Sequence, residues 1–369
     1  MTHRVESLIL FYRTKGFGAR DNRLVQENLA RSIYVELTSA ERMQLAQAAV
    51  SGADKDLEPA LLCLACYFPG SLVPFHKEFV QRRKLHPGVL FHGADSTIAN
   101  EIFNLIDREN EVIGTVTTNH ALTELAWIGD DAVQSAFATW RDKPPLWAST
   151  LFVPPHAYAH EAGWELTADG RRRDLYHKTA FPLIRSSEGD DDDSPRIGIE
   201  HPTLCPWCER RLTVLFDIDD MTVFIPEWHV HCVSVLACDV CSCYGTVFGK
   251  IEEGSRPTWH EANEMPDFLS TGCPVWEPFP NRPLVTSGKT RHFLAAANWL
   301  TYPSVPASQI GGIPTSLQDA EYPQCPDCQQ TMSFVGQISN EDFMEYAEGI
   351  YYAFLCTGCG ITATNYQQS

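Results

Sequence analysis

Two stretches, CPWCERRLTVLFDI at residues 205–218 and CPDCQQTMSFVGQI at residues 325–338, decide how the second half of this chain folds. Each begins with a Cys-Pro-x-Cys motif and continues into a run in which apolar residues alternate. The motif predicts a tight turn that aims two sulfurs at one ion, and the alternation predicts a β-strand after the turn. Because both stretches follow the same order, we expect a duplicated β-rich unit.

Each stretch is followed by a second Cys-x-x-Cys pair, after 29 intervening residues in the first half and 27 in the second. Two such pairs complete a tetrahedral shell of thiolates around Zn²⁺. Both gaps exceed the roughly 15–20 residues of compact sites, but they suit a zinc ribbon whose strands run out from one pair and back to the other. We therefore predict two structural Zn²⁺ ions, with the ligands Cys205, Cys208, Cys238, Cys241, Cys325, Cys328, Cys356 and Cys359.

The predicted metal shells and the remaining motifs argue against catalysis. Four thiolates leave no coordination position for water, as is typical of structural zinc. The sequence has neither a Gly-x-Ser-x-Gly elbow nor a Gly-x-x-x-x-Gly-Lys-Ser/Thr loop. His156 and His160 stand at i and i+4, without the His-Glu-x-x-His order of metalloproteases, and we interpret them as packing residues. We read 309–314, QIGGIP, as a turn, and we predict no catalytic residue, no organic cofactor and no enzymatic activity.

The other cysteines have weaker assignments. Cys63 and Cys66 form a fifth Cys-x-x-Cys inside the apolar segment PALLCLACYF, with no second pair nearby, which favours core packing over a redox or metal role. Cys243 lies two residues after Cys241 and is an alternative to Cys241 as the fourth ligand of the first metal site. The remaining candidates are two single cysteines without a predicted role and two histidines that we interpret as ordinary strand residues: Cys232, Cys273, His229 and His231.

Residues 1–145 predict a helical domain. Apolar residues recur at spacings of three and four in LVQENLARSIYVEL, EPALLCLACYF and TIANEIFNLI. Further along, Gly129 is placed to end one helix, and Asp130 or Asp131 to cap the next. Two amphipathic helices joined in this way resemble a HEAT-type repeat unit, and a generic helical bundle is the alternative.

The predicted domain order follows from a shift in composition. Residues 146–196 read as a transition that ends in the acidic stretch SSEGDDDDSP at 186–195, where four consecutive aspartates repel one another and stay solvated. Residues 197–369 are richer in Val, Ile, Phe, Tyr and Thr, with frequent Pro and Gly, which indicates strands and turns. We therefore predict an α+β protein with a helical domain, a linker and a duplicated β-rich domain.

Charge limits the choice of partner. The chain carries a net charge of −19, and from Glu188 onward 25 acidic and 8 basic residues leave a net of −17. A region this acidic repels a phosphate backbone, so nucleic acid is disfavoured, and it attracts a basic protein. The alternative is that the charge only maintains solubility.

Cysteine content and hydropathy indicate the compartment. No apolar run approaches the roughly 20 residues that cross a bilayer. MTHRVESLILFYRTK has no small-residue cleavage site, so we expect no secretory signal. Thirteen cysteines without an export signal are typical of a reducing environment. We predict a cytoplasmic protein that does not contact a membrane.

The segment ASQIGGIPTSLQDAEYPQCPDCQQTMSFVGQI, residues 307–338, resembles the signature shared by the YwqG-like and programmed-cell-death-protein-2-like zinc-binding families. Its matching parts are the Ile-Gly-Gly-x-Pro turn, the Cys-Pro-x-Cys motif and the strand that ends near Gln-Ile. The closing EGIYYAFLCTGCGITATNY, residues 348–366, also fits. Ser316 and Leu317 stand where family members often carry Trp, so a pocket at that turn would differ.

The resemblance implies a function based on protein binding. Eukaryotic relatives act as chaperones in ribosome assembly, and bacterial relatives are associated with the neutralisation of polymorphic toxins. Together with the acidic second half, the closed metal shells and the absence of catalytic groups, it favours the hypothesis of an immunity protein that blocks a toxin, although the resemblance does not identify the partner. A chaperone for a basic client protein is the first alternative, and a nucleic-acid-binding zinc-ribbon protein is a weaker one.

Overall fold

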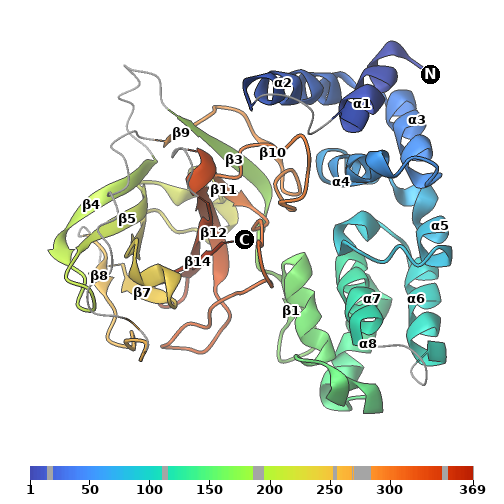
Figure 1. The fold of residues 1–369 in the computed structure, drawn as a ribbon. Coiled ribbons are helices and arrows are strands. Elements are labelled where there is room, and N and C mark those ends of the chain that lie inside the picture. Colours follow the sequence, from blue (N-terminus) through green and yellow to red (C-terminus); the bar gives the residue numbers. More distant parts are fainter. Residues whose placement is uncertain are drawn as a thin grey trace. The chain divides into compact units, whose positions relative to one another are not determined.

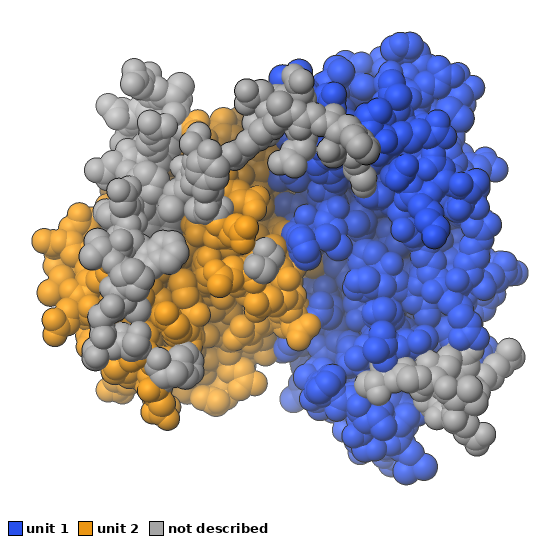
Figure 2. Space-filling view, in the orientation of Figure 1, with its two compact units in different colours: residues 1–174, 294–305 blue, residues 175–293, 306–369 orange. Residues whose placement is uncertain are grey.

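The computed structural model describes residues 1–14, 20–109, 115–185, 195–251, 256–267, 269, 284–342 and 348–368. The chain forms two compact units (Figure 2). The helical unit comprises Met1–Asp174 and Leu294–Val305, and the β-rich unit comprises Leu175–Phe293 and Pro306–Ser369. Helices dominate the first unit and strands the second (Figure 1). The predicted α+β class is therefore confirmed.

The helices begin and end where local signals direct them. Thr38 and Glu41 form a capping box at the start of one helix, and the Asp130 carboxylate accepts the Val133 N–H at 2.9 Å at the start of another. Gly129 has a φ of +55°, as a helix C-cap requires. The α-helices are α1 His3–Thr14, α2 Arg20–Glu36, α3 Ser39–Val50, α4 Glu58–Tyr67, α5 His76–Gln81, α6 Ser96–Glu109, α7 Thr115–Ile128 and α8 Asp131–Asp142.

Short 3₁₀ helices connect these elements. None of the helices that the structure describes combines the length and the apolar character of a membrane span.

The pair α7–α8 is present as predicted, and its assignment to a HEAT-type repeat stays a prediction. The 3₁₀ helices of the helical unit are η1 Lys55–Leu57, η2 Val73–Phe75, η3 Gly88–Phe91, η4 Leu146–Thr150 and η5 Pro155–Ala162.

The helical unit ends later than the predicted residue 145. It includes the hairpin of β1 (Trp164–Leu166) and β2 (Arg172–Asp174). The hairpin belongs there because Trp164 is fully buried, stacks on Phe137 of α8 and donates its Nε1–H to the Ala126 carbonyl at 2.8 Å. The acidic stretch lies outside the described residues except for Pro195. It joins two strands of the β-rich unit, so it does not separate the two units.

A later segment, 294–305, also belongs to the helical unit. The ring of Tyr302 stacks on Phe11 of α1, and its carbonyl accepts a hydrogen bond from the Cys63 Sγ at 3.2 Å. The Tyr67 hydroxyl donates to the Pro303 carbonyl at 2.5 Å. Cys63 and its neighbour Cys66 are both fully buried, as their predicted packing role requires. No sequence pattern predicted this return of the chain.

The helical unit also buries a carboxyl group. Glu124 of α7 is fully buried, and neither of its oxygens has a hydrogen-bond partner within the described part of the chain. Burial raises the pKa of Glu124 well above its usual value, because the low-dielectric interior disfavours the charged form. The folded protein therefore binds this proton more tightly than the unfolded chain does.

Glu124→Gln is expected to remove a pH-dependent loss of stability. The raised pKa of Glu124 contributes to the free energy of unfolding, and this contribution is complete below the unfolded pKa of about 4.3. As the pH rises toward the folded pKa, the free energy of unfolding falls by about 1.4 kcal/mol for each pH unit. Chemical unfolding at pH 5 and pH 8 should show the variant gaining stability over the wild type at the higher pH. Glu6→Gln, at an exposed position of α1, is the matched control. Equal pH dependence in all three proteins would contradict the expectation.

The strands of the β-rich unit form two antiparallel sheets. The larger has nine strands in the order β10-β3-β11-β12-β13-β14-β7-β8, with β9 also paired to β3, and the smaller has the order β4-β5-β6. The strands are β3 His177–Arg185, β4 Arg196–Leu204, β5 Arg211–Ile218, β6 Val233–Ala237, β7 Val247–Lys250, β8 Thr258–Trp259, β9 Leu284–Thr286, β10 Arg291–His292, β11 Gln309–Gly312, β12 Ser333–Ser339, β13 Ile350–Cys356 and β14 Ile361–Gln367.

The duplication is visible in the strand register. In the first half Thr213 of β5 faces Ala237 of β6, and in the second half the aligned Ser333 of β12 faces Leu355 of β13. The register shifts at the same point in both hairpins, between residues 214 and 216 and between 334 and 336. The hairpins β5–β6 and β12–β13 therefore share their pairing and their β-bulge. This is what the duplicated unit inferred from the sequence predicts.

The two repeats of the β-rich unit differ in the path that the chain takes after the second cysteine pair. Gly360 has a φ of +66°, and the chain then returns along β13 as β14. Ser242 stands at the matching position and lies in a 3₁₀ helix, so the chain leaves its own hairpin instead. Strand β7 then pairs with β14 of the other half. The 3₁₀ helices of this unit are η6 Met221–Val223, η7 Pro226–Trp228, η8 Cys241–Cys243 and η9 Asn340–Asp342.

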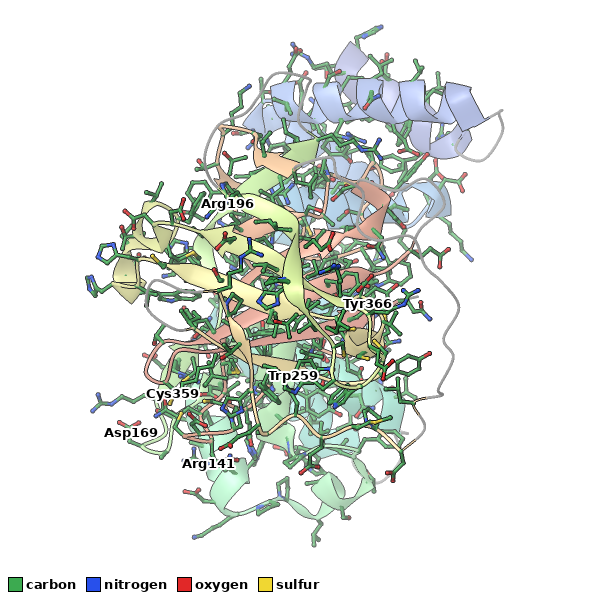
Figure 3. The ribbon with its side chains drawn as sticks, turned by 90° about the vertical axis from the view of Figure 1, so that its left-hand side faces the viewer. Arg141, Asp169, Arg196, Trp259, Cys359 and Tyr366 are labelled. Carbon is green, nitrogen blue, oxygen red and sulfur yellow. The ribbon has the colours of Figure 1, made fainter. Side chains whose placement is uncertain are left out.

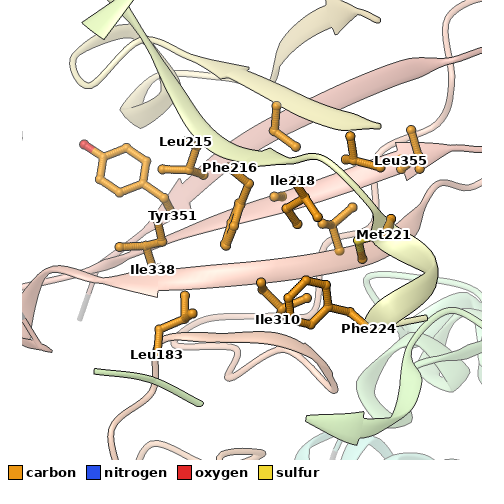
Figure 4. Packing of buried hydrophobic residues seen from close by; sticks show 14 of the residues in the cluster. Leu183, Leu215, Phe216, Ile218, Met221, Phe224, Ile310, Ile338, Tyr351 and Leu355 are labelled. Carbon is orange, nitrogen blue, oxygen red and sulfur yellow. The ribbon is translucent and has the colours of Figure 1, made fainter. Parts of the chain in front are cut away.

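The core of the β-rich unit lies between its two sheets (Figure 4). Alternating residues of β5, such as Phe216 and Ile218, pack against Val335 of β12 and Ala353 of β13. A second apolar cluster on the other face of β12 and β13 includes Phe334. Because successive strand residues point to opposite faces, one strand contributes to both clusters. The strands that follow the two Cys-Pro-x-Cys turns therefore run through a two-layer core, and the cysteine turns lie at its ends.

Candidate metal centres

The structure gathers the eight predicted ligands into two groups of four. Within each group, the sulfur atoms all lie within 4.8 Å of one another. The first tetrad joins the turn before β5 to the turn after β6, and the second joins the turn before β12 to the turn after β13. The first tetrad is Cys205, Cys208, Cys238 and Cys241, and the second is Cys325, Cys328, Cys356 and Cys359.

Three of the four turns share one backbone conformation. In each, the carbonyl of the first cysteine accepts the N–H of the fourth residue after it, and that fourth residue has a left-handed φ between 60° and 66°. This conformation tightens the loop so that both sulfurs face the same side. The bonded pairs are Cys205–Glu209 at 2.9 Å, Cys325–Gln329 at 2.8 Å and Cys356–Gly360 at 2.9 Å.

The fourth turn closes differently. Ser242 donates its N–H to the Cys238 carbonyl at 2.9 Å, as in the other turns, and its side-chain oxygen accepts the Cys238 N–H at 3.3 Å. The Cys238 sulfur accepts the Cys241 N–H at 3.4 Å. The turn therefore orients its two sulfurs even though η8 replaces the left-handed residue.

The distances between sulfurs match a tetrahedral metal site. A metal at 2.3 Å from four sulfurs places neighbouring sulfurs about 3.8 Å apart. The measured separations are 3.7 Å for Cys205–Cys241, 3.5 Å for Cys208–Cys238 and 3.6 Å for Cys328–Cys356. All of these cysteines are free thiols. The donor set fits a metal ion that prefers thiolates and accepts four ligands.

The first tetrad is the more enclosed. Only Cys208 of its four cysteines is partly accessible. Leu212, Leu236, Val240 and Leu269 pack around the group. Such surroundings exclude water and slow the exchange of a bound ion.

The second tetrad lies closer to the solvent. Cys328 is exposed and Cys359 is half-buried, while Cys325 and Cys356 are buried. Figure 3 labels Cys359. We therefore expect reagents from solution to reach this group before the first.

The local environment favours thiolates at particular positions. Contacts with the thiols of Cys238 and Cys241 lower the pKa of Cys205 to about 2. The backbone N–H of Gln330 lowers the pKa of Cys328. Burial or neighbouring thiols raise the pKa of five other ligands, so a metal that binds the deprotonated sulfurs displaces protons from these positions: Cys208, Cys238, Cys241, Cys325 and Cys359.

The other candidate residues lie outside the tetrads. Cys243 does not replace Cys241: it is exposed, and its Sγ lies 3.5 Å from the Asp239 carbonyl. Cys232 is exposed and donates to the Asp219 carbonyl at 3.4 Å. Cys273 lies outside the described residues.

The prediction that His229 and His231 lie on a strand is wrong. His229 ends η7 with a φ of +52°, and His231 precedes β6, so neither lies on a strand. His156 and His160 lie on a 3₁₀ helix, which has three residues per turn, so an i, i+4 pair does not share one face. Burial lowers the pKa of both. The segment 309–312, predicted as part of a turn, is strand β11 with a register shift at its end.

Sequence reasoning missed two residues beside the tetrads. The rings of Trp259 and Trp207 meet edge to face with centroids 5.0 Å apart, and Nε2 of His260 lies 3.3 Å from Oδ1 of Asp327. Trp207 and Asp327 both lie inside Cys-Pro-x-Cys turns. Trp259 and His260 are far from those motifs in sequence, and no spacing pattern marks them.

Fold and site together define an α+β protein with a helical unit and a β-rich unit that carries two tetracysteine groups arranged as the ligands of a metal ion. No protein-family model matches the chain, and no solved structure matches it. The chain is 34% identical over 325 residues to the uncharacterized protein YpfL of Salmonella typhimurium, an alignment that covers 86% of this chain and 74% of that protein. The chain therefore belongs to the family of YpfL.

Proposed function

We propose that this protein is a cytoplasmic, zinc-stabilised binding module that holds a basic protein partner and catalyses no reaction. The observation that carries the proposal is the pair of tetrads, in which all four positions of each predicted shell are cysteine sulfurs. A shell of this kind has a structural role, because it presents no open position to a substrate or a water molecule.

Zinc is the metal that this donor set favours. Four thiolates in a tetrahedral arrangement suit Zn²⁺, whereas oxygen-rich sites suit Mg²⁺ or Ca²⁺. The ion would cross-link the two ends of each β-hairpin, with Cys205 to Cys241 at one site and Cys325 to Cys359 at the other. In an unfolded chain these turns are separated, so metal binding contributes directly to folding.

The charge of the β-rich unit supports a basic partner. Its residues include 25 acidic and 10 basic side chains, a net of −15. Basic residues on β4 and β5 are already paired: Arg196 lies 2.8 Å from Asp217 and 3.0 Å from Asp219, and Arg211 lies 2.5 Å from Glu200. The excess of negative charge would speed encounter with a positively charged protein and would repel nucleic acid.

Within this class we propose an immunity protein that neutralises a toxin. Support comes from the resemblance of residues 307–338 and 348–366 to the YwqG-like and programmed-cell-death-protein-2-like families. A chaperone for a basic client would use the same charge and the same closed metal sites. The two functions differ in the partner that each would retain.

Native co-purification is the experiment that tests the proposal. The tagged full-length chain, isolated from its own cells at physiological salt after nuclease treatment, should retain one stoichiometric protein with a net positive charge. Higher salt should weaken the complex, because screening reduces the attraction between opposite charges. A toxin whose growth arrest this chain relieves would support immunity, and a ribosomal or secreted client would support the chaperone.

Two results would contradict the proposal. Recovery of nucleic acid in place of a protein, in a parallel isolation at physiological ionic strength without nuclease, would favour a zinc-ribbon protein that binds nucleic acid. Turnover of a small-molecule or protein substrate that depends on this chain would contradict the non-enzymatic assignment.

A further inference from the structure

The two Cys-Pro-x-Cys turns differ within the motif at the third residue, which is Trp207 in the first tetrad and Asp327 in the second. Each of these residues contacts one of two consecutive residues, Trp259 and His260. An aromatic ring meets an aromatic ring, and a carboxylate meets an imidazole. One short segment thus touches one turn of each tetrad.

The contact with the first tetrad is aromatic. The rings of Trp207 and Trp259 have centroids 5.0 Å apart and planes at 85°, which is a favourable edge-to-face geometry. Trp259 is held in β8 by antiparallel pairing with Gly249 of β7. Both indoles pack against the apolar cluster that contains Cys205 and Cys241. Figure 3 labels Trp259.

The contact with the second tetrad is polar. Nδ1 of His260 accepts the Ala262 N–H at 3.1 Å, so the ring proton is on Nε2. Nε2 then lies 3.3 Å from Oδ1 of Asp327, a close polar contact. His260 is buried, and its own N–H donates to the Phe248 carbonyl at 3.1 Å. The imidazole therefore has a defined orientation toward the turn of Cys325 and Cys328.

Strand β7 completes the connection. Val247 packs into the cluster around the first tetrad, and the next residue, Phe248, packs on the opposite face against the cluster that contains Cys325 and Cys356. Asn263 fixes Phe248 through two hydrogen bonds, accepting its N–H at 2.7 Å and donating to its carbonyl at 2.8 Å. Strands β7 and β8 thus carry contacts with the surroundings of both tetrads.

We propose that the β7–β8 hairpin couples the two metal centres, so that loss of the ion at one tetrad weakens retention at the other. The inference rests on the proposed binding of metal by both tetrads. Removing an ion releases the turn that it closes, and the hairpin loses its contact with Trp207 or Asp327. The hairpin then supports the other turn less well. By thermodynamic linkage the effect operates in both directions.

The test measures zinc release from the first tetrad with and without an ion in the second. A chromogenic chelator reports released Zn²⁺, and alkylation of Cys208, followed by mass spectrometry, reports the opening of the first tetrad. Cys328→Ser removes a ligand from the second tetrad and should speed release from the first at least tenfold. In a His260→Phe background, which cuts the contact with Asp327, the same change should speed release less than twofold.

Further variants address folding and specificity. Asp56→Asn, at an exposed position of the helical unit, should release both ions as the wild type does. If Cys328→Ser fails to fold, Asp327→Asn keeps all eight ligands and should reduce the cooperativity of Zn²⁺ binding to the full-length apoprotein. Reciprocally, Cys208→Ser should weaken the Zn²⁺ affinity of the second tetrad by the same factor as Cys328→Ser weakens that of the first.

The outcomes separate this inference from the assignment of the metal. A wild-type protein that binds two zinc ions with independent release rates, unchanged by Cys328→Ser or Asp327→Asn, would overturn the coupling alone. Wild-type protein that folds normally and binds no metal would overturn the proposed metal sites and the coupling with them. A tenfold effect that persists in the His260→Phe background would assign the coupling to another route and overturn the role of the hairpin.

Discussion

Cys325→Ser is expected to halve the zinc content of the purified protein, from two ions to one, and to destabilise the β-rich unit. Cys325 is fully buried, and its N–H and carbonyl both hold the turn before β12. Serine retains the turn but replaces a thiolate with a weakly acidic hydroxyl. A structural zinc site contributes on the order of 10 kcal/mol or more to folding, comparable with the whole stability of a typical domain at roughly 5–15 kcal/mol. Metal analysis and thermal unfolding of the variant measure the two effects.

Cys232→Ser is the matched control for this variant. The substitution is chemically the same, but Cys232 is exposed and lies outside both tetrads. It should retain two zinc ions and unfold at the same temperature as the wild type. If Cys325→Ser also retained two ions in zinc-saturated buffer, Cys325 would leave the set of ligands.

Treatment with a chelator should strip the second tetrad before the first. The exposed Cys328 and the half-buried Cys359 admit the competing ligand, whereas the first tetrad lies inside an apolar cluster. In the presence of an alkylating agent, we expect Cys328 and Cys359 to react at least tenfold faster than Cys205 and Cys238. Mass spectrometry of peptides taken at successive times gives the order.

Two internal references accompany the chelation experiment. Cys63 is fully buried in the helical unit and should stay unmodified until that unit unfolds. Cys232 is exposed in the wild type and should react at once, with or without chelator. Earlier modification of Cys205 and Cys238 than of the second tetrad would show that enclosure does not govern release.

The local parts of the metal centres could be predicted from sequence. A gap of two residues leaves the chain few ways to place two cysteines other than in a tight turn, and the strand after each turn follows from alternating apolar residues. The alignment of residues 205–218 with 325–338 then indicated which pairs belong together. Helix ends such as Gly129 and Asp130 were predictable for the same reason, because capping depends on residues within one turn of the helix.

Other features depended on contacts between distant parts of the chain. Strand β7 could pair with β6 or with β14, and the difference follows from how the chain leaves the turn at Ser242. The return of 294–305 to the helical unit depends on a buried site for Tyr302. The partners of Trp207 and Asp327 are about 50 and 70 residues away in sequence, a separation that no periodicity reports.

By itself, the sequence determined the eight cysteines, their grouping in pairs, the helical and β-rich halves and the acidic charge. Tertiary structure alone decided that β7, after the first tetrad, pairs with β14, after the second, how far each tetrad is enclosed, and which side chains lie beside both. The reason is physical: turns, caps and strand alternation arise from interactions within a few residues, whereas burial and strand pairing are settled only when the whole chain competes for the same core.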